Sequence, residues 1–151
     1  MSTTTTTRDE TAILAVLQEH ADAIRARDAE RTIAAFDRTV VRYDLAPPLA
    51  QVNGTVEEDA AGLRAWFATF DGPVQITHRD PTVVADGDVA FVHTLTSMTA
   101  TPTGTTESFT LWFRSTYGLR RLDGAWAVVH QHESVPFHMD GSFAAAVGLT
   151  P

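Results

Sequence analysis

Apolar residues recur at helical spacing in the first stretch of the chain. Thr7 and Glu10 have the spacing of a capping box, which predicts where a helix begins. The helix is expected to reach about Arg27, behind a polar tail at residues 1–8 that we expect to be disordered. The positions on its apolar face are Ile13, Val16, Leu17, His20, Ala21 and Ile24.

Two more helices and a short strand are predicted before residue 74. Asp28 can cap a short second helix. Residues 40–44 form a β-branched run that is typical of a strand and stops at a pair of prolines. Thr55 and Glu58 form a second capping box, which starts a third helix that we expect to stop at Gly72.

The second half of the chain alternates apolar and polar residues, as strands do. Turn signals separate four predicted strands, at residues 74–85, 88–101, 105–122 and 125–136. Helices followed by strands predict an α+β fold, in which three N-terminal helices cover the concave face of a curved antiparallel sheet of four long strands and a short one. Such a sheet encloses a cone-shaped pocket at its open end.

One domain is expected, covering residues 9–138. Residues 139–151 form a C-terminal extension, in which we expect a short helix around residues 143–147.

Composition excludes several kinds of chemistry. The chain contains neither cysteine nor lysine, so thiol nucleophiles, cysteine-ligated metals and Schiff bases are excluded. A net charge of −8 argues against a nucleic-acid partner, because neutralising phosphates needs a basic face. No apolar run is long enough to predict a membrane span, and no signal peptide is recognised at the N-terminus, so we expect a cytoplasmic protein.

The turn at residues 123–124 sets the register of the last two strands and so decides which side chains share a face. Strict alternation from this turn directs His130 and His132 into the pocket and pairs Arg114 with Glu133 on the outer face. The side chains expected to line the pocket are Tyr43, Trp66, Phe67, His93, Phe113, Ser115, Tyr117, His130 and Ser134. The outer face also carries Trp112, Val129 and Val135, an apolar patch on which we expect a homodimer to form.

The sequence allows two roles for His130 and His132. They can perform acid/base or orienting work, or they can bind a metal, because His-x-His on a strand points both rings the same way. His93 or Asp80 would then supply the third ligand. No third ligand stands at a motif spacing, so we expect no metal and no other cofactor.

A resemblance to a known family rests on the order of these elements and on several short segments. The segments are Tyr43-Asp44, Pro47-Pro48-Leu49, Gly87-Asp88-Val89-Ala90-Phe91, Asp123-Gly124-Ala125-Trp126 and His130-Gln131-His132-Glu133-Ser134-Val135-Pro136-Phe137. Over residues 9–137 the chain resembles the SnoaL-like and ketosteroid isomerase-like branch of the nuclear transport factor 2-like superfamily. One fold of this kind hosts many reactions, so the resemblance is more specific for fold than for activity.

The resemblance also implies roles for individual residues. Asp44 stands at the place of the general-base aspartate of ketosteroid isomerases, and His20 at the place of their oxyanion-binding tyrosine. Their second oxyanion donor, a protonated aspartate, has no carboxylate match here, and Thr116 is nearest. SnoaL-like relatives use an aspartate or histidine for aldol-type ring closure.

These readings predict cofactor-free acid/base catalysis on a small hydrophobic carbonyl compound, as in an isomerase, an aldol-type cyclase or a dehydratase. Asp44 is the expected base, and His132 and His20 stabilise or protonate the oxygen. The alternatives are a non-catalytic small-molecule binding protein with the same cavity, and an epoxide or ester hydrolase that uses water activated on Asp44. In purely structural readings Asp44 caps a turn and His20 is a core histidine satisfied by a carbonyl.

Overall fold

The computed structural model describes residues 3–151, and side chains from Arg8 onward. The helices are α1 (Thr3–Arg25), α2 (Ala29–Ala34) and α3 (Val56–Phe67). The strands are β1 (Phe36–Tyr43), β2 (Gln51–Val52), β3 (Phe70–Asp86), β4 (Val89–Pro102), β5 (Phe109–Leu122) and β6 (Ala125–Ser134). In this part of the chain no helix combines the length and the hydrophobicity needed to cross a membrane.

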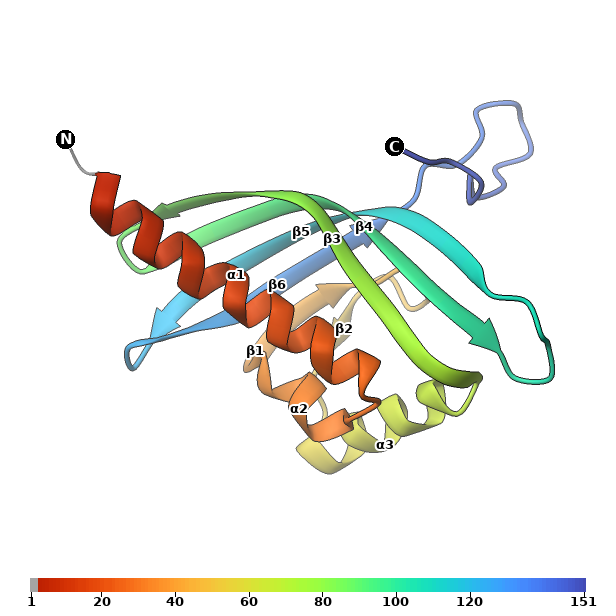
Figure 1. The fold of residues 1–151 in the computed structure, drawn as a ribbon, viewed down its shortest axis with the longest axis horizontal. Helices are drawn as coiled ribbons and strands as arrows, with labels where there is room; N and C mark the ends of the chain where they lie inside the picture. The colour runs from red at the N-terminus through yellow and green to blue at the C-terminus, as the bar shows by residue number, and fades with distance from the viewer. Residues whose placement is uncertain (1–2) are drawn as a thin grey trace.

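The six strands form one curved sheet in the order β2-β1-β6-β5-β4-β3 (Figure 1). Strands β3 to β6 are the predicted antiparallel meander, and β1 joins the free edge of β6 in parallel. Short β2 then pairs antiparallel with β1. The α+β prediction is confirmed, with one parallel pair and one extra short strand that the sequence reading did not include.

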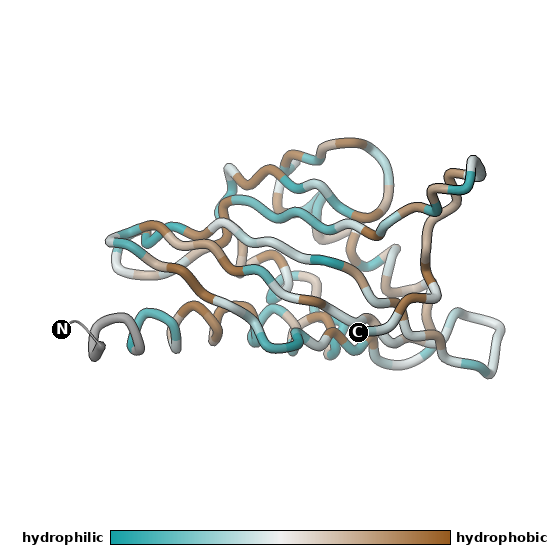
Figure 2. The backbone as a smooth tube through the Cα atoms, turned by 90° about the horizontal axis from the view of Figure 1, so that it is seen from above, coloured by the Kyte–Doolittle hydropathy of each residue, from teal (hydrophilic) through white to brown (hydrophobic). Residues whose placement is uncertain are grey.

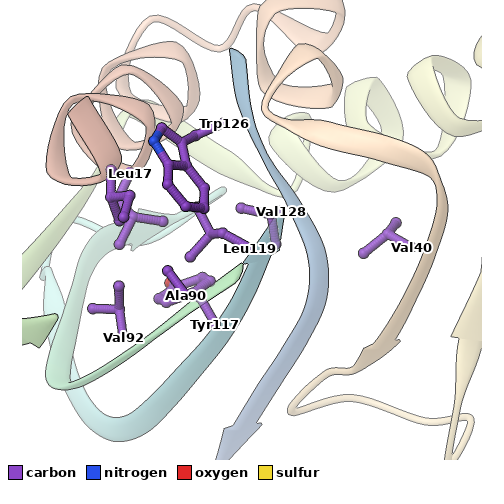
Figure 3. Packing of buried hydrophobic residues seen from close by; sticks show 9 residues of the cluster. Leu17, Val40, Ala90, Val92, Tyr117, Leu119, Trp126 and Val128 are labelled. Atoms are coloured by element: carbon purple, nitrogen blue, oxygen red, sulfur yellow. The ribbon is translucent and has the colours of Figure 1, made fainter. Parts of the chain in front are cut away.

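Helix α1 crosses one face of the sheet, and α2 and α3 follow near its far end (Figure 1). Seen from above, α1 runs along this face while apolar and polar residues alternate along the strands (Figure 2). Ile13 and Leu17 of α1 are buried against strands that carry Val92, Leu119 and Val128 (Figure 3). The apolar face predicted for the first helix is therefore the face that packs on the sheet.

Local capping signals were accurate for two helices. The Asp28 side chain accepts a hydrogen bond of 3.0 Å from the backbone N–H of Arg31 and caps α2. Thr55 and Glu58 form the expected reciprocal capping box at the start of α3. Helix α1 instead begins at Thr3, before the predicted cap, because threonine weakens a helix without stopping it. Residues 1–2 of the predicted tail lie outside the described residues.

The end of the third helix was predicted too late. Helix α3 ends at Phe67, and Phe70 already opens β3. Gly72 and Pro73 lie inside this strand rather than stopping a helix. The register of β3 against β4 shifts between Asp71 and Gln75, and this irregularity accommodates a proline that cannot donate to the ladder.

The C-terminal extension contains no helix among the described residues. Gly141 and Phe143 adopt positive φ angles, +86° and +55°, which close a turn instead of continuing a helical segment. The chain doubles back so that Phe137 bridges to Ala145, and Ala146 is buried. The short helix expected around residues 143–147 is therefore wrong.

Candidate active site

A cavity of about 660 Å³ lies between the helices and the inner face of the sheet. Its apolar wall is made by Ile24, Ile33, Phe36, Leu63, Trp66, Ile76, Met98, Leu111 and Phe113. Its polar lining includes His20, Arg42, Asp44, Gln131 and Glu133. A mostly apolar cavity of this size with a few convergent polar groups is typical of a small-molecule site.

A β-bulge in β6 decides which of its side chains reach this cavity. Leu119 of β5 pairs with Val128, but the adjacent Gly118 pairs with His130, so Val129 is left without a partner. One extra residue reverses the alternation of inward and outward side chains. Gln131 and Glu133 therefore turn inward, onto the face that carries Val128 before the bulge.

The same bulge places the two strand histidines on the outer face, where the sequence reading did not expect them. Tyr43 of β1 packs edge-to-face against both rings, at 4.8 Å from His130 and 5.5 Å from His132. Ser134 accepts a hydrogen bond of 3.2 Å from the Arg114 side chain. The predicted placement of His130, His132 and Ser134 in the pocket is wrong, because strict alternation was carried through the bulge. The predicted placement of Tyr43 is also wrong, because its neighbour Arg42 on β1 faces the cavity and Tyr43 therefore faces outward.

Other predicted lining residues also lie elsewhere. His93 sits on the outer face of β4, stacked beside Phe91 at 6.4 Å. Phe67 is buried in the core, and Ser115 and Tyr117 face inward but are covered by other residues. The Arg114–Glu133 pair predicted for the outer face does not form, because Glu133 points inward.

Among residues 8–151, no group of three or more His, Asp or Glu side chains is close enough to hold a metal ion. Asp80, one third ligand considered for the histidine pair, has a side chain that is 95% exposed. Within these residues, His130 and His132 therefore have no further side chains near them that would complete a metal site.

Four of the predicted residues do line the cavity: His20, Asp44, Trp66 and Phe113. Asp44 follows β1 directly, and its side chain is 18% exposed. Their placement brings one carboxylate and one imidazole to the same apolar cavity. Their chemical roles stay predictions.

Asp44 is held from two sides. Gln131 Nε2 donates a hydrogen bond of 3.0 Å to Asp44 Oδ1, and Arg42 Nη1 lies 3.4 Å from Oδ2. Arg42 and Gln131 are paired in the parallel ladder of β1 and β6, so the two side chains lie next to each other and both reach the Asp44 carboxylate. Arg42 is itself placed by Gln51, which accepts a 3.3 Å hydrogen bond, and by the ring of Phe36, 5.7 Å away.

Glu133 is another carboxyl group of the cavity lining, which also contains Glu58 in the α3 capping box and Asp59 against Arg38. Burial and, to a smaller extent, the charge of Asp44 raise the pKa of Glu133 to about 7, while the Arg42 guanidinium opposes the shift. Such a carboxyl exchanges its proton near neutral pH. The sequence reading missed the inward position of Arg42, Gln131 and Glu133. The adjacent apolar pair Val128-Val129, which breaks the alternation of β6, was the available signal.

His20 faces the cavity from α1. Its Nδ1 lies 3.0 Å from the carbonyl oxygen of Thr32, and its ring meets Phe36 edge-on at 4.8 Å. Burial lowers the pKa of His20 to about 4, so the ring is neutral at physiological pH. The prediction that a carbonyl group satisfies His20 therefore holds for the Nδ1 edge of the ring. The opposite edge belongs to the cavity lining.

A row of polar side chains crosses the inner face of the sheet and lies outside the residues that line the cavity. His78 Nδ1 lies 3.2 Å from the Thr96 hydroxyl, which lies 2.9 Å from the Ser115 hydroxyl. Tyr117 shares a hydrogen bond with Ser115, and burial raises the pKa of Tyr117. Burial also lowers the pKa of His78 to about 4.

Comparison with known proteins matches these features to one family. The model of the SnoaL-like domain matches residues 13–138. A nuclear transport factor 2-like protein of unknown function from Pseudomonas putida KT2440 is 28% identical, with a TM-score of 0.81 over 96% of this chain and 98% of that one. No curated protein sequence matches the chain.

Two more solved structures share the fold at lower identity. A proposed scytalone dehydratase from Novosphingobium aromaticivorans is 14% identical, with a TM-score of 0.76 over 97% of this chain and 98% of that one. A ketosteroid isomerase-like protein from Erwinia carotovora is 22% identical, with a TM-score of 0.66 over 82% of this chain and 93% of that one. Because the family model covers most of the chain, the protein belongs to the SnoaL-like family.

Proposed function

We propose that the protein catalyses cofactor-free acid/base chemistry on a hydrophobic carbonyl compound. The observation that carries the proposal is that Asp44 and Glu133 line one mostly apolar cavity, in which burial raises the pKa of Glu133 to about 7. A carboxyl group that keeps its proton near neutral pH is suited to act as an acid beside a second carboxyl group that is held in place by hydrogen bonding. Glu133 takes the acid role that the sequence reading gave to His132.

Asp44 is the proposed base. Gln131 and Arg42 hold the carboxylate in one orientation at the cavity wall. A bound ketone would present the carbon next to its carbonyl group to Asp44, which removes a proton. The electrons of the broken C–H bond move into a carbon–carbon double bond, and the carbonyl becomes an enolate.

Glu133 is the proposed acid. In its protonated form it donates its proton, or a hydrogen bond, to the oxygen that becomes negative in the enolate. Arg42, whose charge also acts on Glu133, stabilises the same negative charge. Returning the proton from Asp44 to a different carbon gives an isomerisation. Loss of a hydroxyl group that takes the Glu133 proton gives a dehydration, with water as the leaving molecule.

The structural neighbours are consistent with this reaction class. One carries the name of a dehydratase and another is called ketosteroid isomerase-like. Both are less than 25% identical to this chain, so they support the fold, and the proposed chemistry rests on the Asp44–Glu133 pair.

Hydrogen–deuterium exchange on a model ketone tests the proposal without knowledge of the natural substrate. NMR would follow exchange of the acidic C–H protons of 2-tetralone in heavy water with the wild-type protein. We expect Asp44→Asn to slow the catalysed exchange by about 10²- to 10⁴-fold, because a positioned general base contributes that much. Asp80→Asn, which changes an exposed aspartate, is the matched control and should leave exchange unchanged.

Two results would contradict the proposal. Exchange no faster with the wild-type protein than with buffer, combined with measurable binding of 2-tetralone, would favour the non-catalytic binding protein. Exchange that survives in Asp44→Asn would assign the proton transfer to another group.

A further inference from the structure

The hydrogen bond made by His20 determines which ring nitrogen carries its proton. A carbonyl oxygen only accepts hydrogen bonds, so the Nδ1 that faces the Thr32 carbonyl at 3.0 Å must be the donor. In a neutral ring the other nitrogen, Nε2, then has a lone pair and no proton. The resemblance implied that His20 donates to a substrate oxygen, whereas this geometry makes it a hydrogen-bond acceptor.

This acceptor belongs to the cavity. His20 is one of the lining residues, and its Nδ1 is already used by Thr32. The edge of the ring that carries Nε2 is therefore the edge that can contact a bound molecule. Only a ligand group with an O–H or N–H hydrogen can satisfy it.

The surroundings of His20 favour an acidic hydroxyl group. Its ring packs edge-on against Phe36, and the Arg42 guanidinium lies 5.7 Å from the centre of that same ring. The positive charge of Arg42 also lowers the pKa of His20 slightly, so the two side chains interact electrostatically. A hydroxyl oxygen that gives its hydrogen to His20 gains negative character, and a nearby cation stabilises it. A phenol, which is more acidic than an alkyl alcohol, gains most from this arrangement.

The rest of the cavity fits a flat ring system. Phe36, Trp66 and Phe113 present aromatic surfaces, and Met98 adds a thioether that packs well against rings. The volume of about 660 Å³ is within the range of sites for molecules of drug size, which includes fused-ring aromatics.

We propose that His20 determines ligand specificity, because its Nε2 accepts a hydrogen bond from a phenolic hydroxyl group and so selects ligands that carry one. The hydroxyl group donates to His20 Nε2 at one end, and the carbonyl group lies toward Asp44 and Glu133. The carbonyl half of this statement rests on the proposed function, whereas the hydroxyl half rests on the hydrogen bonding of His20 alone.

A pair of probes that differ in one hydrogen-bond donor tests the hydroxyl half. Isothermal titration calorimetry would compare 2-naphthol with 2-methoxynaphthalene, which has a similar shape and no donor. We expect the wild-type protein to bind 2-naphthol about threefold to tenfold more tightly, the usual effect of one hydrogen bond.

Two variants separate the contact with the ligand from the contact with Thr32. His20→Asn places an amide N–H where Nδ1 stood, so it can keep the Thr32 hydrogen bond while it removes the acceptor. His20→Gln can place a carbonyl oxygen where Nε2 stood, so it keeps the acceptor and loses the Thr32 hydrogen bond. We expect the preference for 2-naphthol to disappear in His20→Asn and to remain in His20→Gln.

Three results would overturn the proposal: no binding of either probe, equal binding of both by the wild-type protein, or a preference that persists in His20→Asn. Asp44→Asn separates this inference from the proposed function. It should keep the preference for 2-naphthol while it loses proton exchange on 2-tetralone. Loss of exchange without any preference would leave the catalytic proposal in place and reject the role of His20.

Discussion

Gln131 of β6 donates a hydrogen bond of 3.0 Å to Asp44, which follows β1 and lies 87 residues earlier in the sequence. The parallel pairing of β1 with β6 and the bulge at Val129 together bring these side chains to one point. Gln131 is only 6% exposed, so its amide is well placed to hold the carboxylate in one orientation.

Replacing Gln131 by methionine should therefore lower the rate of proton abstraction while the ligand still binds. The variant keeps a side chain of similar shape and removes the donor. We expect kcat for exchange on 2-tetralone to fall about threefold to tenfold with KM nearly unchanged, because one orienting hydrogen bond is lost. Gln75→Met, at an exposed position of β3, is the control. A rise in KM with unchanged kcat would mean that Gln131 serves binding instead.

The raised pKa of Glu133 predicts a pH-dependent cost to stability. The folded protein holds this proton up to about pH 7, whereas an unfolded glutamate releases it near its ordinary value of 4.5. The stabilising contribution is therefore complete below pH 4.5 and is lost as the pH rises through 7. Glu133→Gln stays neutral throughout. We expect the free energy of unfolding of the wild type, relative to this variant, to fall by about 2 to 3 kcal/mol between pH 4.5 and pH 8.

Urea unfolding at a series of pH values measures this difference. Glu107→Gln, which changes an exposed glutamate in the loop before β5, should show no such trend. A constant difference between the wild type and Glu133→Gln would mean that Glu133 is ionised in the folded protein at the same pH as in the unfolded chain.

The buried histidines predict the opposite dependence in acid. Burial lowers the pKa of His78 to about 4, so the folded state resists protonation that the unfolded chain accepts near pH 6.5. Stability is therefore present above pH 6.5 and is lost as the pH falls toward 4. We expect the free energy of unfolding of His78→Gln to fall by about 2 to 3 kcal/mol less than that of the wild type over this pH range. Protonation of His20 should account for a similar part of the wild-type decrease. His93→Gln on the outer face is the control, and an equal acid loss in His78→Gln would refute the expectation.

Rules that depend on neighbouring residues predicted local structure well. Asp28 and Thr55 were recognised as helix caps because their partners lie three residues away in the sequence. The turn predicted at residues 123–124 does join β5 to β6, and Leu122 pairs with Ala125 across it. These features need no information about the rest of the fold.

The site depends on contacts that local patterns do not contain. Gly118 opposite His130 marks the position where the register shifts, and a shift of one residue reverses every inward position after it. For this reason the sequence predicted that His132 faces the pocket, whereas its neighbour Glu133 does so in the structure. Asp44 and His20 were found through the resemblance to a family, which preserves positions, and not through the geometry of the strands.

The outer face of the sheet predicts self-association, which stays a proposal. Phe91 is 46% exposed there, and Val84, Val89 and Leu95 are exposed as well. An apolar patch of this kind is costly to leave in water. We expect the protein to sediment as a dimer at micromolar concentration, and Phe91→Arg to weaken the dimer at least about tenfold. Leu49→Arg, at a loop residue that is 98% exposed, is the control. A wild-type monomer at micromolar concentration would contradict this expectation.

The central claim is that Asp44 and Glu133 act as a coupled base and acid. It can be tested directly by NMR titration of the Glu133 carboxyl carbon in protein labelled with ¹³C-glutamate, with Glu133→Gln identifying the signal. We expect a midpoint near pH 7 in the wild type and a lower midpoint in Asp44→Asn, because removal of the Asp44 charge removes one cause of the raised pKa. A midpoint near 4.5 in the wild type, or one that Asp44→Asn leaves unchanged, would contradict the account.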